Sequence, residues 1–239
     1  MNNLPSIFND VIGPIMRGPS SSHTAGSWRV AKIAVQLLNK PLSEALISFD
    51  KDGAWVTNYE DQGTVLGMNG GLLEIDMADN RMKQTETIAK ERGIKINYQI
   101  SSFKNNHPNS MQLKLMGASG NKVEILAASL GGGSFEIQKI DGFKINTKGD
   151  YYELYIWAYD DIEQELQDIL PLSSQLITRE KSGKFLYVFK SHESFNEGLI
   201  RHIKSFPQVG KVADILPIMP IVSGRQKALP FDSVEHLSV

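Results

Sequence analysis

The stretch from Arg17 to Arg29 constrains the fold more than any other part of the chain. Its sequence, RGPSSSHTAGSWR, places a Gly-Pro pair before three serines, a histidine and a threonine. Apolar residues then recur at helical spacing from Trp28 to Leu38, and Pro41 ends the pattern. This arrangement predicts a polar loop that opens directly into a helix.

The residues of this loop suit an anion. Serine is a favoured helix N-cap, and the free N–H groups of a first helical turn, at the positive end of the helix dipole, bind carboxylate or phosphate. His23 adds a titratable side chain, and Arg17 and Arg29 add positive charge from either side. A plainer interpretation stays open, in which the serines only cap the helix and His23 is solvated. Three serines followed by histidine and threonine exceed what one cap requires, which favours an anion-binding or catalytic role.

Composition excludes several classes of function. The 239 residues include 25 Lys and Arg against 27 Asp and Glu, so nothing directs the chain to nucleic acid or to an anionic membrane surface. Cysteine is absent, which excludes a disulfide framework, a thiolate nucleophile and a Cys-ligated cluster within this chain. Because neither a signal peptide nor an apolar run of membrane-spanning length is found, we expect a cytoplasmic protein.

The remaining patterns predict an α+β fold in two units. In residues 1–147, alternation predicts strands at 46–50 and 94–100, a helix at 82–92 and an antiparallel hairpin of 110–116 with 121–128. Gly131-Gly132-Gly133 predicts a tight bend before a strand at 135–140, since no P-loop Lys-Ser/Thr follows.

Residues 148–222 predict a second, smaller unit. A strand at 151–159 is followed by a helix at 161–170, a hairpin of 174–180 with 184–190, a helix at 194–205 and a last strand at 209–219. This is the β-α-β-β-α-β order of the split ferredoxin-like arrangement. Residues 223–239 are expected to form an extended tail or a linker to a partner chain.

Several motifs resemble those of one enzyme family. Gly18–Thr24, preceded by Ile12-Gly13-Pro14, resembles the signature near the start of the iron–sulfur-dependent L-serine dehydratases, in their beta chain or beta domain. Gln62-Gly63-Thr64 is similar to the family's Gly-His-Gly-Thr turn, His107-Pro108-Asn109 to its His-Pro-Asn loop, and Ser129–Gly133 to its glycine-rich turn. The likeness covers roughly the first three fifths of the chain.

The resemblance implies a fold for both units. Residues 1–147 would form a serine-dehydratase beta domain, similar to the allosteric substrate-binding domain of certain phosphoglycerate dehydrogenases, and residues 148–222 an ACT-like domain. The acidic-Arg-Pro-Gly turn usual in ACT domains is replaced here by Asp160-Asp161-Ile162-Glu163. We therefore expect packing or dimerisation from this unit rather than the usual binding of an amino acid.

The resemblance also implies a reaction, the conversion of L-serine to pyruvate and ammonia by an L-serine ammonia-lyase. In such enzymes an exposed iron of a [4Fe-4S] cluster polarises the substrate hydroxyl while a base removes the α-proton. A chain without thiolates cannot hold that cluster, so we expect a partner, the alpha chain, to carry it in a hetero-oligomer. No metal ligand is expected among the residues of this chain.

The same resemblance assigns roles to individual residues. His23 is the expected catalytic residue, as a hydrogen-bond donor or proton carrier, and Ser20, Ser21, Ser22 and Thr24 would bind the substrate carboxylate. His107 and Asn109, which by themselves read as an ordinary turn, would complete that pocket or form a separate effector site for serine.

Alternatives of other classes stay open. The chain could be a regulatory serine-binding module or a scaffold for the alpha chain without a catalytic role. It could be a natural subunit or one half of a fused polypeptide, and the sequence does not choose between them. A self-contained hydrolase is disfavoured, because no G-x-S-x-G elbow is present.

Overall fold

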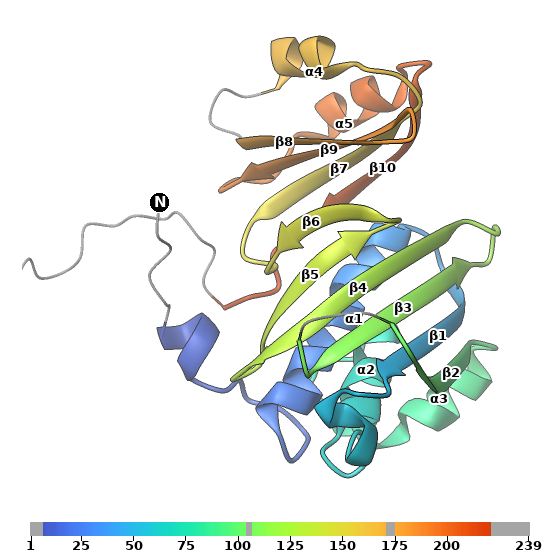
Figure 1. Cartoon of the computed structure of the whole chain (residues 1–239), viewed down its shortest axis with the longest axis vertical. Helices are drawn as coiled ribbons and strands as arrows, with labels where there is room; N and C mark the ends of the chain where they lie inside the picture. The colour runs from blue at the N-terminus through green and yellow to red at the C-terminus, as the bar shows by residue number, and fades with distance from the viewer. Residues whose placement is uncertain (1–6, 104–106, 171–174, 221–239) are drawn as a thin grey trace, which may run out of the picture.

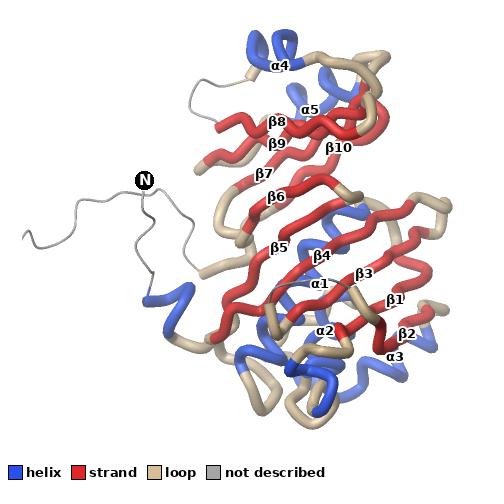
Figure 2. The backbone as a smooth tube through the Cα atoms, viewed as in Figure 1, coloured by secondary structure: helices blue, strands red, loops and turns tan. Residues whose placement is uncertain are grey.

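The computed structural model describes residues 7–103, 107–170 and 175–220 and consists of two β-sheets with helices on one face of each (Figures 1 and 2). The first sheet has the strand order β2-β1-β3-β4-β5-β6 and the second the order β10-β7-β9-β8. The first sheet comprises β1 (Leu42–Asp50), β2 (Lys95–Ser101), β3 (Ser110–Gly117), β4 (Lys122–Gly131), β5 (Ser134–Ile140) and β6 (Phe143–Thr147). The second comprises β7 (Tyr152–Ala158), β8 (Gln175–Lys181), β9 (Lys184–Ser191) and β10 (Val209–Ile215). The predicted α+β class is therefore confirmed.

The first sheet is antiparallel except for β1 and β2, which run parallel. The predicted hairpin is β3 with β4, and the glycine turn at 131–133 makes the predicted bend, with positive φ at all three glycines. The crossover from β1 to β2 contains α2 (Thr64–Leu72) and α3 (Thr85–Glu91). The helix predicted at 82–92 begins later, because Asp79 accepts a bond from the Arg81 N–H (2.8 Å) and caps a 3₁₀ turn at Asn80–Gln84.

Helix α1 (Gly26–Leu38) is buried between the first sheet and α2. Its apolar face, including Val30, Ile33 and Leu37, enters the main core with alternate residues of β1, β3 and β4. Helix α2 can approach α1 closely because Gly67 and Gly71 have no side chain. A Cβ on Gly67 would collide with the Thr24 carbonyl, and a Cβ on Gly71 would collide with the Trp28 carbonyl. Small residues on α2 therefore determine where the start of α1 lies.

The second unit has the predicted order of elements, β7-α4-β8-β9-α5-β10, with α4 (Glu163–Ile169) and α5 (Glu197–Lys204). Both helices cover the face of the sheet that points away from the first unit (Figure 1). Along β7, Leu154 and Ile156 pack under these helices, whereas Tyr155 faces the first unit. The predicted tail at 223–239 lies outside the described residues.

The two units share one apolar core. Tyr155, Leu186 and Ile215 of the second sheet belong to the cluster that contains α1 and the first sheet. Polar contacts add to it: Asn39 Nδ2 donates to the Val212 carbonyl (3.0 Å), and the Leu216 N–H donates to Gln36 Oε1 (2.7 Å). The second unit is thus held against the C-terminal end of α1.

Candidate functional site

The polar loop forms a π-helical turn, Ser21–Ala25, that runs without interruption into α1. Ser20 occupies the N-cap position with an extended backbone, but its hydroxyl makes no capping bond to a backbone N–H. The first backbone bond of the turn runs from the Thr24 N–H to the Ser20 carbonyl (2.7 Å). The preceding N–H groups, at 21–23, therefore need partners from outside the helical ladder, which leaves them suited to an anion.

The serine hydroxyls are directed to histidine instead of to the backbone. Ser20 Oγ lies 3.1 Å and Ser22 Oγ 3.2 Å from His23 Nδ1, and the two hydroxyls are 3.1 Å apart. The plainer interpretation, in which the serines only cap the helix, is wrong for the side chain of Ser20, which makes no hydrogen bond to a backbone N–H of the turn. Ser21, also half-buried, lies beside Gly13.

Asn58 and Trp55 hold the other side of the imidazole. His23 Nε2 is 3.3 Å from Asn58 Oδ1, and the His23 ring is tilted against the buried Trp55 ring with centroids 5.4 Å apart. In the neutral tautomer with a proton on Nε2, that N–H donates to Asn58 and one serine hydroxyl donates to Nδ1, while the second hydroxyl can donate to the first. Partial burial lowers the pKa of His23 below its ordinary value, although the bond to Asn58 opposes the shift. Burial therefore favours the neutral form of the His23 ring.

Thr24 lies beneath the loop rather than on its surface. It is fully buried, and Thr24 Oγ1 donates to the Gln62 carbonyl (3.3 Å). A Cβ on Gly18 or Gly63, both in conformations that favour glycine, would collide with the Thr24 side chain. Thr24 therefore joins the loop to the Gln62-Gly63-Thr64 turn, and the predicted contact of its hydroxyl with substrate stays a prediction.

Ser27, one turn into α1, fixes the same junction. Its hydroxyl lies 2.6 Å from the His23 carbonyl and 2.9 Å from the Thr64 carbonyl. The sequence interpretation did not single out Ser27, Asn58 or Trp55. No local pattern marks them, since Asn58 meets His23 across 35 positions and Thr64 meets Ser27 across 37.

The His107-Pro108-Asn109 loop lies next to the serine loop and is joined to it through the backbone. The Ser129 N–H donates to the Asn109 carbonyl (3.0 Å), while Ser129 Oγ donates to the Ser22 carbonyl (2.7 Å). The Ala54 N–H donates to the Pro108 carbonyl (2.8 Å), which connects the loop to the segment that carries Trp55. Within the loop, His107 Nδ1 accepts from the Asn109 N–H (3.1 Å). The two predicted halves of the site are thus neighbours, with the buried Ser129 between them.

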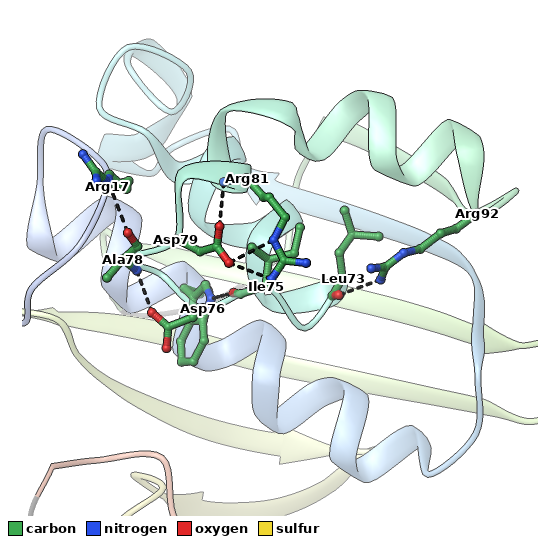
Figure 3. Close-up of polar contacts among 9 residues, drawn as sticks. Arg17, Leu73, Ile75, Asp76, Ala78, Asp79, Arg81 and Arg92 are labelled. Atoms are coloured by element: carbon green, nitrogen blue, oxygen red, sulfur yellow. Dashed lines mark hydrogen bonds and ion pairs between the residues drawn. The ribbon is translucent and has the colours of Figure 1, made fainter.

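Both arginines that flank the loop are anchored to backbone carbonyls. Arg17 is anchored to the segment after α2, where its Nε donates to the Ala78 carbonyl at 3.1 Å (Figure 3). Its backbone N–H donates to the Met77 carbonyl (2.7 Å). Arg29 is buried and donates from Nη1 to the Gly133 carbonyl (2.7 Å). Burial lowers the pKa of Arg29 from its ordinary value. Both side chains therefore position the backbone around the loop.

The described residues offer no metal site. Within them no group of three His, Asp or Glu side chains could hold a metal ion, and the full sequence lacks cysteine. The donor set does not fit an iron–sulfur cluster, which needs thiolates.

Two proteins of known name have related sequences. The probable L-serine dehydratase beta chain of Bacillus subtilis (strain 168) is 36% identical over 146 residues, which is 61% of this chain and 64% of that protein. The L-serine dehydratase beta chain of Peptoniphilus asaccharolyticus is 32% identical over 143 residues, 59% of this chain and 64% of that protein. This chain is similar to L-serine dehydratase beta chains. The resemblance predicted from the Gly18–Thr24 motif is confirmed, over slightly less than two thirds of the length of these relatives.

Other comparisons add little. No family model matches the sequence. A crystal structure of Staphylococcus aureus homoserine dehydrogenase aligns with 47% of this chain and 33% of its own at 18% identity, with a TM-score of 0.23. That score is too low to carry an argument about the fold. In the described part of the chain, every helix falls short of the length and apolar character needed to cross a membrane.

Proposed function

We propose that this chain is the beta chain of a cytoplasmic L-serine ammonia-lyase, which converts L-serine to pyruvate and ammonia together with an alpha chain. The names of the two relatives support this proposal, as does the Gly18–Thr24 motif. A [4Fe-4S] cluster of the expected kind would be held by the alpha chain, since the residues of this chain do not fit it. In this proposal the second unit, residues 148–222, is an ACT-like domain used for packing or dimerisation.

The proposal gives the serine loop the task of binding the substrate carboxylate. The N–H groups at 21–23 precede the first backbone bond of the turn, and they lie at the positive end of a helix that continues through α1. Ser20, Ser21 and Ser22 are all half-buried, so a ligand held there is partly shielded from water, which strengthens its hydrogen bonds. Orientation of a bound substrate supplies a large part of many rate enhancements, so a chain without the cluster can still be essential.

The observation that carries the catalytic part is the environment of His23. Asn58 fixes one ring nitrogen and the serine hydroxyls face the other, while burial favours the neutral ring. A neutral imidazole with its Nδ1 lone pair directed at two hydroxyls can accept a proton or orient those hydroxyls toward a ligand. His107 and Asn109, joined to the loop through Ser129, would complete the pocket or hold serine as an effector.

The test is anaerobic pyruvate formation from L-serine by this chain mixed with its cluster-bearing alpha chain. His23→Gln is expected to lower kcat about 100-fold or more, within the range for loss of a general acid or base, while the two chains still associate. Ser22→Ala should raise KM more than it lowers kcat, because it removes a binding contact. His202→Gln is the matched control, since His202 is exposed on α5.

Each outcome separates the alternatives. Activity that requires the mixture and falls in the His23 variant supports the catalytic role. Full activity of that variant with altered dependence on serine concentration would make the chain a regulatory module. Full activity with an unchanged dependence on serine concentration in both His23→Gln and Ser22→Ala would indicate that the chain serves only as a scaffold for the alpha chain.

A further inference from the structure

Strand β2 forms the edge of the first sheet that lies farthest from the second unit (Figure 1). It pairs with β1 over seven consecutive residues, and no bulge interrupts the register. Its sequence, KINYQIS, contains no proline and carries one charge, at Lys95. Proline, bulges and charged side chains are the devices that keep an edge strand from pairing with another chain. Beyond Lys95, β2 has none of them.

Each of the other three sheet edges in the described chain carries such a device. At the opposite edge of the first sheet, side chains of the second unit occupy backbone groups of β6. The Lys144 carbonyl accepts from Arg179 Nε (3.0 Å), and the Asn146 carbonyl accepts from Lys190 Nζ (2.7 Å). This edge is therefore closed from within the chain.

The second sheet protects both of its edges. Strand β8 ends in the charged run Arg179–Lys181. Strand β10 has a bulge between Val209 and Lys211, and its Val212 carbonyl accepts from Asn39 Nδ2 of the first unit (3.0 Å). Among these edges, β2 is thus the one suited to accept a further strand.

The backbone groups that β2 offers belong to Ile96, Tyr98 and Ile100. The Ser101 carbonyl faces the β1 side, where it accepts the Lys51 N–H (3.0 Å). Because the backbone groups of successive residues point to opposite sides of a strand, those of Ile96, Tyr98 and Ile100 point away from β1. Three N–H donors and three carbonyl acceptors thus line the open edge.

The side chain of Ile100 also lacks a cover. Ile96, Tyr98 and Ile100 share the face of the sheet that bears the helices. Ile96 and Tyr98 pack against the apolar core there, whereas Ile100 is 50% exposed. A further strand beside β2 would bury Ile100, and burial of that apolar surface favours the pairing.

We propose that β2 pairs with β2 of a second copy of this chain, antiparallel and centred on Tyr98, so that the two first sheets become one. In this register Ile100 lies opposite Ile96 of the second copy on the helix face. On the other face, Asn97 lies opposite Gln99 of the second copy. Apolar side chains therefore meet apolar side chains, and amides meet amides.

A second copy suits this edge because β2 complements itself. Lys95 lies opposite Ser101 of the second copy, so the one charge of the strand does not face its like. The outward N–H and carbonyl groups of Ile96, Tyr98 and Ile100 all find partners in this register. The proposal places self-association on the first unit and leaves packing to the second. It does not depend on the reaction assigned to the serine loop.

The test follows the full chain over a range of concentrations. Sedimentation equilibrium should show a monomer–dimer equilibrium. Hydrogen exchange measured by NMR should show the N–H groups of Ile96, Tyr98 and Ile100 protected only at concentrations where the dimer forms. The N–H groups of Asn97 and Gln99, which face β1, are the internal control and should be protected at every concentration.

Two substitutions at one position probe the pairing. Ile100→Pro should weaken dimerisation roughly tenfold or more, because it removes an outward N–H from each copy while leaving the ladder with β1 intact. Ile100→Lys should also weaken it, since a charge would then face Ile96 of the second copy. Ile15→Lys is the matched control, because Ile15 is 88% exposed and lies before the serine loop, away from β2.

Several outcomes would overturn the proposal. A chain that stays monomeric at every concentration does so, as does a dimer that leaves these three N–H groups unprotected or that Ile15→Lys weakens equally. Protection that appears only when the alpha chain is added would assign the edge to that chain instead of to a second copy. If Ile100→Pro fails to fold by circular dichroism, an unchanged dimer in Ile100→Lys overturns the proposal and a weaker one supports it.

Discussion

His23 and Asn58 meet through a contact of 3.3 Å between Nε2 and Oδ1, although 35 positions separate them in the chain. The contact selects the ring nitrogen that carries the proton, and it leaves Nδ1 for Ser20 and Ser22. Asn58 therefore acts on the candidate site by positioning His23.

Substitution of Asn58 should move the pKa of His23 in a direction set by the substituent. Asn58→Ala removes the one interaction that raises this pKa, so the pKa should fall further. Asn58→Asp places a carboxylate beside the ring, which favours the imidazolium, so the pKa should rise. NMR titration of the His23 ring protons measures both, and opposite shifts are expected. Shifts of the same sign would show that Asn58 does not contact the ring in solution.

The lowered pKa of His23 also predicts a pH dependence of stability. In the unfolded chain the ring titrates near its ordinary pKa of 6.5, whereas in the folded chain it takes up its proton only at lower pH. Between these two values the unfolded state binds more protons, so stability is fully present above pH 6.5 and is lost as pH falls toward the folded pKa. His23→Gln should flatten this part of the curve of unfolding free energy against pH. An unchanged slope would assign the pH dependence to other groups.

Gly71 should tolerate no side chain, because a Cβ there would collide with the Trp28 carbonyl and the Ala31 side chain of α1. Gly71→Ala is expected to lower the unfolding free energy by about 1–3 kcal/mol, as overpacking does. It should also displace the start of α1 and with it the serine loop. Gly13→Ala is the control, because its Cβ would meet Ser21 at an ordinary 3.6 Å. Urea denaturation of both variants compares them, and equal stability would contradict the close packing of α2 on α1.

A buried carboxylate should be among the most sensitive positions near the junction of the units. Glu153 is 1% exposed and accepts from Thr147 Oγ1 (2.6 Å) and Tyr155 OH (2.6 Å), and it pairs with Lys190 Nζ at 3.0 Å. Glu153→Gln leaves the mostly buried Lys190 ammonium without its counter-charge, and we expect a loss of about 3 kcal/mol.

The control for Glu153 is Glu197→Gln. Glu197 forms an exposed pair with Arg201 on α5, which contributes about 0.5 kcal/mol or less. Both variants are compared by urea denaturation. A small effect at Glu153, equal to that at Glu197, would mean that the Glu153 network does not stabilise the fold.

Local patterns predicted most of the elements. Alternation in β2 and β3, the glycines between β4 and β5, and the order of the second unit all follow from neighbours in sequence. The start of α3 differs from the prediction because a side chain caps a short turn before it. Asp79 caps a 3₁₀ turn at Asn80–Gln84, so α3 begins later than predicted.

Less of the candidate site than of the fold could be predicted from the sequence. Ser20–His23 could be recognised as a cluster because its members are adjacent, but the direction of each hydroxyl could not. Asn58 and Ser129 reach the loop through hydrogen bonds to residues 35 and 107 positions away, and Trp55 reaches it by packing against the His23 ring. A local sequence pattern cannot show contacts between segments so far apart in the chain.

By itself, the sequence determined the α+β class, the order of the elements, the absence of thiolate ligands and the resemblance to L-serine dehydratase beta chains, because composition, periodicity and contiguous motifs are local properties. Only the tertiary structure decided that Asn58 and the serine hydroxyls share the His23 ring and that Thr24 is buried. Those features arise when distant segments pack together, and burial and hydrogen bonding then fix each side chain.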